Sequence, residues 1–140
     1  MIIINHKNAI RLLIGILSLV IIFHFLILVK IIPFNIAWGG RLKSEQEMYV
    51  FESISVALNL FLIWIILLKA KNVKRKIINI ILWIFLGIFS LDTIGNLFAK
   101  TTFEKFFSIL TFIFALLILR ILMKKKWRTH NTRYKKLPRK

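Results

Sequence analysis

Three ionisable residues, His24, Glu52 and Asp92, lie within long apolar runs of this chain. Ionisable groups are costly inside a membrane, where they commonly bind a ligand, carry a proton or pair with one another. Two carboxylates and an imidazole could bind a cationic or hydrogen-bonding ligand, with the imidazole exchanging protons. The same three groups could instead pair with one another or with neighbouring amides and fix the packing of the helices.

The runs that carry these residues are long enough to cross a membrane. The chain has 140 residues, of which 59% are hydrophobic, more than a soluble domain of this size tolerates on its surface. A helical span needs about 20 apolar residues. We expect an all-α, polytopic four-helix bundle within residues 1–126 and a basic tail at 124–140. The predicted spans are 10–31, 46–69, 77–99 and 103–123.

The distribution of charge predicts how the chain threads through the membrane. Five basic residues and no acidic one lie from the end of the second span to the start of the third, Lys69, Lys71, Lys74, Arg75 and Lys76, and the tail is basic throughout. The positive-inside rule places both in the cytoplasm, so both termini are predicted to be cytoplasmic. Abundant Ile, Lys, Asn and Phe, whose codons are AT-rich, further indicate a bacterial protein and hence the cell (cytoplasmic) membrane.

A formal net charge of +17 would indicate nucleic-acid binding in a soluble protein. In a membrane protein, a basic cluster beside a span enforces orientation and attracts anionic lipids, at about 1 kcal/mol per residue near the surface. We therefore expect the tail to contact anionic lipids, and we expect no nucleic-acid partner.

The three ionisable residues reach a similar depth. At 1.5 Å of rise per residue, His24 lies about 9 Å from the end of its span, and Glu52 and Asp92 lie about 12 Å inside theirs. Neighbouring spans run in opposite directions, so all three fall in the predicted extracytoplasmic half. If their helices are adjacent there, the side chains can form one polar pocket.

Polar side chains continue along the same helix faces. Asn59 shares a face of the second span with Glu52, and Asn96 shares a face of the third with Asp92. Ser108 and Thr111 give the fourth span a small, weakly polar stripe. We expect these stripes to face the interior of the bundle, where small residues permit close helix packing.

Ser44 and Glu47 have the spacing of a capping box. In that motif the serine side chain accepts the Glu47 amide, and the glutamate side chain accepts the Ser44 amide. The second helix is therefore predicted to begin near Ser44.

The connection before Ser44 contains Trp38-Gly39-Gly40-Arg41. Arg41 could pair with lipid phosphate or with Glu45, or it could clamp an anionic group over the mouth of the bundle. We retain Arg41 as a candidate binding residue.

Several chemistries are disfavoured. The chain has no cysteine, which excludes thiol and disulfide chemistry for this chain alone. No span carries two histidines or a His-Glu pair at i, i+4 spacing, and there is no G-x-S-x-G motif. We expect no enzymatic activity, no metal and no cofactor.

Two stretches carry a resemblance to known proteins. They are IPFNIAWGGRLKSEQEMYVFE, from Ile32 to Glu52, and TIGNLFAKT, from Thr93 to Thr101. They resemble segments of small uncharacterised four-span membrane proteins of bacteria, and the resemblance extends over most of the chain. It implies the four-span fold and no particular activity.

Three functions fit these features. The first is binding of a lipid or small amphiphile in a polar pocket on the extracytoplasmic side. The second is a structural or accessory role beside another membrane protein or a second copy of the chain, and the third is small proton-coupled transport. The candidate binding residues are His24, Glu52, Asn59, Asp92, Asn96 and Arg41.

Overall fold

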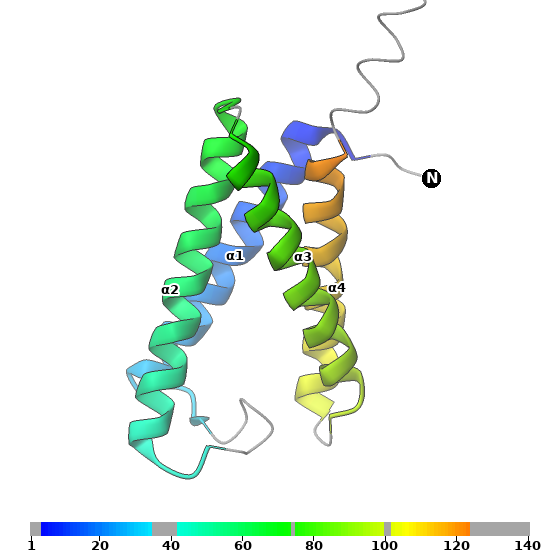
Figure 1. Cartoon of the computed structure of the whole chain (residues 1–140). Coiled ribbons are helices and arrows are strands. Elements are labelled where there is room, and N and C mark those ends of the chain that lie inside the picture. Colours follow the sequence, from blue (N-terminus) through cyan, green and yellow to red (C-terminus); the bar gives the residue numbers. More distant parts are fainter. Residues whose placement is uncertain (1–3, 35–41, 74, 100–101, 124–140) are drawn as a thin grey trace, which may run out of the picture.

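The computed structural model describes residues 4–34, 42–73, 75–99 and 102–123. This part of the chain is all-helical (Figure 1). The four helices are α1 His6–Leu28, α2 Glu45–Ala70, α3 Lys76–Leu97 and α4 Thr102–Leu122.

Each helix is long and apolar enough to span a membrane, which suggests a multi-pass membrane protein. The helices contain 21 to 26 residues. At 1.5 Å per residue they are about 32 to 39 Å long, against a hydrocarbon core of about 30 Å. The prediction of an all-α fold with four such helices is confirmed.

The first helix differs most from its predicted range of 10–31, because it begins at His6 and ends at Leu28. At its start, the helix includes polar residues that precede the apolar run. Their backbone hydrogen bonds begin with Ala9 N–H to Asn5 C=O at 2.8 Å. At its end, the chain leaves the helix before the apolar run is complete. The limits of an apolar run predict the segment that hydrocarbon could cover, and they do not fix the ends of the helix.

The end of α1 is set by Lys30, which has a positive φ of 59°. Ile31 N–H donates to Leu26 C=O and Lys30 N–H donates to Ile27 C=O, both at 2.9 Å. These two bonds form a Schellman motif, which ends a helix and turns the chain. The same pair of bonds follows α2, where Asn72 has the positive φ.

The helices form a ring in which each is antiparallel to the next. The most extensive packing is within two hairpins, α1 with α2 and α3 with α4, while α4 lies beside α1 and α2 beside α3. Figure 1 shows that α2 and α3 converge at the turn between them and diverge toward their other ends. We call the end with the α2–α3 turn the closed end, and the end with the other two connections the open end.

The main hydrophobic core fills the closed end. It takes residues from all four helices, including the fully buried Leu17, Leu62, Leu82 and Ile118. A smaller cluster of Ile27, Leu42 and Met48 lies at the open end, between α1 and α2 only. Among the described residues, neither buried apolar cluster joins the two hairpins at the open end.

The start of α2 matches the predicted cap in one of its two hydrogen bonds. Ser44 is the N-cap residue, and its hydroxyl accepts the Glu47 N–H at 3.2 Å. The Glu47 carboxylate accepts the N–H of Lys43 at 2.7 Å, one residue before the predicted Ser44 amide. The extended backbone at Ser44 presents the preceding N–H to the carboxylate.

Ser44→Ala should lower the free energy of unfolding by about 1 kcal/mol, because it removes the acceptor for a helix-terminal N–H. Unfolding by SDS in mixed micelles, followed by circular dichroism, measures this change. Ser53→Ala, an exposed serine of α2, is the control and should have little effect. Equal losses in the two variants would contradict a capping role for Ser44.

Candidate functional site

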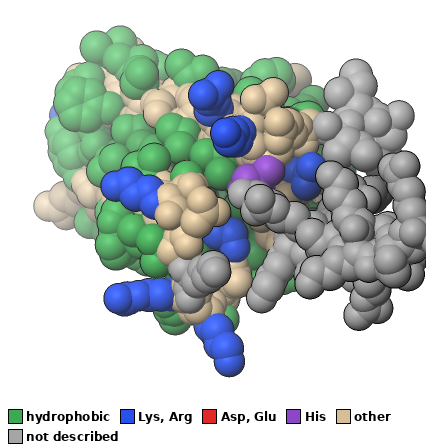
Figure 2. Space-filling model, turned by 90° about the horizontal axis from the view of Figure 1, so that it is seen from above, with side chains coloured by type: hydrophobic (Ala, Val, Ile, Leu, Met, Phe, Trp, Pro, Cys, Tyr) green, Lys and Arg blue, Asp and Glu red, His purple; other side chains and the backbone are tan. Residues whose placement is uncertain are grey.

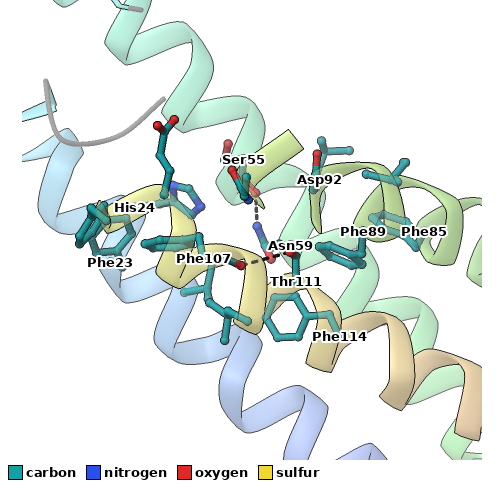
Figure 3. Close-up of a pocket in the computed structure, with 17 residues that line it drawn as sticks. Phe23, His24, Ser55, Asn59, Phe85, Phe89, Asp92, Phe107, Thr111 and Phe114 are labelled. Atoms are coloured by element: carbon teal, nitrogen blue, oxygen red, sulfur yellow. Dashed lines mark hydrogen bonds between the residues drawn. The ribbon is translucent and has the colours of Figure 1, made fainter. Parts of the chain in front are cut away.

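A pocket of about 400 Å³ lies between the two hairpins, on the open-end side of the core (Figure 3). All four helices contribute to its walls. Its volume falls within the range of about 300 to 1,000 Å³ that is common for small-molecule sites. Its polar side chains are His24, Ser55, Asn59, Asp92, Asn96, Glu104 and Thr111.

Six phenylalanines form much of the apolar wall, in two groups of touching rings. In one group the ring centroids are 5.0 to 5.9 Å apart, and its members are Phe23, Phe103 and Phe107. In the other they are 5.0 to 6.2 Å apart, and its members are Phe85, Phe89 and Phe114. Such rings offer both apolar surface and π-faces to a ligand.

His24 and Glu52 form a pair that joins α1 to α2. His24 Nδ1 and Glu52 Oε2 are 2.5 Å apart, the glutamate side chain is fully buried, and the histidine side chain is 15% exposed. His24 lines the pocket, and Glu52 is not among its lining residues. Glu52 lies on the side of α2 that faces α1, where the imidazole of His24 binds it. The carboxylates of Glu52 and Asp92, predicted to share a pocket, therefore do not lie together in its wall.

Asp92 and Asn96 both line the pocket from one face of α3. Asp92 is exposed rather than packed against other side chains. Neither side chain forms a hydrogen bond or an ion pair with another residue in the described part of the chain. A carboxylate and an amide therefore face the pocket and can form hydrogen bonds or ion pairs with a ligand.

Polar groups on the neighbouring helices have partners. Asn59 donates from its amide to the Ser55 carbonyl oxygen at 2.8 Å, within α2. The hydroxyls of Thr93 and Thr111 are 2.9 Å apart and join α3 to α4. Ser108 and Thr111 are buried, so the small stripe of the fourth helix faces inward, as predicted.

Glu104 is a pocket residue that the sequence analysis did not include. It lies in the first turn of α4, is buried, and lines the pocket. The available signal was its spacing, since Glu104, Ser108 and Thr111 recur at i, i+4 and i+7 and so share a face.

The carboxylates of Asp92 and Glu104 lie at different depths in the pocket. The Thr93–Thr111 contact places Asp92 near the level of Thr111. Glu104 precedes Thr111 by seven residues, which corresponds to about 10 Å along α4 toward the open end.

Glu45 lies outside the pocket, on the open-end side of α2, where it pairs with Lys30. Lys30 Nζ is 2.6 Å from Glu45 Oε2. This hydrogen bond raises the pKa of the Lys30 ammonium. Arg41, predicted to pair with Glu45 or to bind a ligand, lies outside the described residues.

Among the described residues, no group of three or more His, Cys, Asp or Glu is arranged to hold a metal ion.

Comparisons with known proteins do not indicate a function for this pocket. No family model, curated protein or solved structure matches the chain. The function is therefore inferred from the geometry of the pocket alone.

The His24–Glu52 pair predicts non-additive effects on stability. His24→Leu should lower the free energy of unfolding by about 3 kcal/mol, because the buried carboxylate of Glu52 loses its imidazole partner. In the double variant with Glu52→Leu, the loss should be smaller than the sum of the two single losses, by about 1 kcal/mol or more. SDS unfolding of the four proteins measures this coupling, and strictly additive losses would contradict the pairing.

Proposed function

We propose that this protein is inserted in the bacterial cytoplasmic membrane through its four helices and binds a lipid or another small amphiphile in the pocket between its two hairpins. The observation that carries this proposal is the pocket itself, which combines phenyl rings with two polar side chains, Asp92 and Asn96, that have no partner among the described residues. The proposal includes cytoplasmic placement of both termini and no enzymatic activity.

The outer faces of the helices support membrane insertion. Large apolar side chains point away from the bundle on every helix, for example Leu19 at 65% exposed, Leu91 at 70% and Phe106 at 66%. So much exposed apolar surface would be unfavourable in water. Contact with lipid hydrocarbon removes that cost.

The two ends of the bundle differ in charge, which supports the orientation. All five acidic residues of the chain lie in the half of the bundle toward the open end: Glu45, Glu47, Glu52, Asp92 and Glu104. Figure 2 looks onto the closed end, where several lysine and arginine side chains are exposed and no acidic side chain is visible. By the positive-inside rule, the closed end is cytoplasmic.

Labelling of single cysteines tests the orientation, since the natural chain has none. Gln46→Cys at the open end should react with a membrane-impermeant maleimide in intact cells. Lys71→Cys at the closed end should react only after the membrane is permeabilised. The reverse pattern would contradict the proposed orientation.

The pocket is amphipathic, which supports an amphiphile as its ligand. Its outer part carries Asn96 and Glu104, while Phe85 and Phe114 lie deeper, toward the core. A polar head would lie toward the open end, and an apolar chain would contact the rings.

The pocket also has a side that faces lipid. Leu58 of α2 and Ile88 of α3 both line it, yet they remain 48% and 41% exposed. These residues stand on the two helices that diverge toward the open end. A lipid chain could leave the pocket between them, so that only part of the ligand needs to fit within about 400 Å³.

Proton-coupled transport is a second candidate function, favoured by the His24–Glu52 pair beside the pocket. Transport needs the pocket to communicate with both sides of the membrane. The main core fills the closed end, and this supports binding from one side over passage through the bundle.

A tryptophan that fills the pocket tests ligand binding. Ser55→Trp places a bulky side chain on the wall of the pocket, whereas Ser53→Trp places it on the exposed side of the same helix. Native mass spectrometry should detect a small bound species on the wild type and on Ser53→Trp, and little or none on Ser55→Trp.

Two outcomes would contradict this function. The same adduct on all three proteins would place the bound species outside the pocket. A wild type without an adduct, but with a second protein at fixed stoichiometry, would instead favour the accessory-subunit function.

A further inference from the structure

The charges around the pocket indicate the kind of head group it would accept. The described lining residues include the carboxylates of Asp92 and Glu104 and no lysine or arginine. His24, the one basic side chain among them, is bound to Glu52. The carboxylate of Asp92 is therefore the pocket charge that has no partner among the described residues, and it would attract a cation and repel an anion.

Asp92 is the acidic residue of the pocket region best placed to bind a cation. Glu52 is paired with His24, whereas Asp92 has no partner among the described residues. A carboxylate that faces phenyl rings, away from any described cation, is unfavourable unless something compensates its charge. A cationic ligand would supply that compensation and gain binding energy in return.

One face of α3 presents the complementary groups in order of depth. Phe85, Phe89, Asp92 and Asn96 follow i, i+4, i+7 and i+11 spacing, and all four line the pocket. Two rings thus lie on the core side of the carboxylate, and an amide lies one turn toward the open end. Phenyl faces attract cations within about 6 Å of the ring centroid, and an amide oxygen accepts an ammonium N–H.

We propose that the ligand is an organic ammonium ion with an apolar chain, whose head binds Asp92 and Asn96 and whose chain lies against Phe85 and Phe89. The chain leaves toward lipid between Leu58 and Ile88. This inference rests on the proposed function, because it names the chemical class of the amphiphile.

A pair of probes with the same chain length tests the inference. Dodecylammonium and dodecanol are added at equal mole fraction to the protein in a neutral detergent, and their adducts are counted by native mass spectrometry. Each probe is compared between wild type and Asp92→Asn, so that differences in ionisation between the probes cancel. Asp92→Asn keeps the shape of the side chain, and its elution in gel filtration checks that it is folded.

The dodecylammonium adduct should fall about tenfold in Asp92→Asn, and the dodecanol adduct should change little. Glu45→Gln is the matched control, since it removes one negative charge outside the pocket, and it should keep the wild-type level of both adducts. Ser55→Trp should lose both adducts.

Two results would overturn the inference in distinguishable ways. If Asp92→Asn binds dodecylammonium as the wild type does, while Ser55→Trp loses both probes, the pocket binds amphiphiles without selecting an ammonium head. If Ser55→Trp keeps both adducts, the pocket does not bind these amphiphiles, and the proposed function fails as well.

Discussion

The divergence of α2 and α3 is the feature on which the rest of the structure depends. The rings of Phe61 and Phe85, with centroids 6.2 Å apart, mark a contact between the two helices midway along them. On one side of this contact the core closes the bundle, and on the other the hairpins separate and leave the pocket. On the open-end side of this contact, each hairpin is held internally by a polar contact, His24–Glu52 in one and Thr93–Thr111 in the other. Both hairpins can therefore diverge without losing their own packing.

The proposed insertion in a membrane makes hydrogen bonding decisive for this arrangement. Hydrocarbon offers no hydrogen bonds, so polar side chains within the helices need partners from the protein or from a ligand. Several hydroxyls and the Asn59 amide donate to backbone carbonyls, as Ser90 does to Leu86 at 2.7 Å. Within the described residues, Asp92 and Asn96 are among the pocket side chains without a partner of their own. The polar side chains that lack hydrogen-bond partners thus identify the binding face of α3.

Local signals in the sequence predicted more of the fold than of the site. Apolar length gave the four helices, capping spacing gave the start of α2, and helical periodicity gave the inward faces of α3 and α4. The site depends on which helices are neighbours, and no local pattern encodes this. Glu52 was therefore grouped with Asp92, although it faces α1, and Glu104 was not among the candidate residues. Several phenylalanines of α4 also line the pocket, and they were not among the candidates. The orientation and the ligand remain predictions.

The central claim is that Asp92 faces a pocket open to the extracytoplasmic side, and cysteine reactivity tests it most directly. Asp92→Cys should react with a small, charged, water-soluble methanethiosulfonate reagent applied to intact cells. Leu91→Cys, whose native side chain is 70% exposed on the outer surface of α3, should be protected by lipid. Faster reaction at residue 92, slowed by the additional change Ser55→Trp, is the predicted result. Equal protection of both cysteines would contradict a pocket at this position.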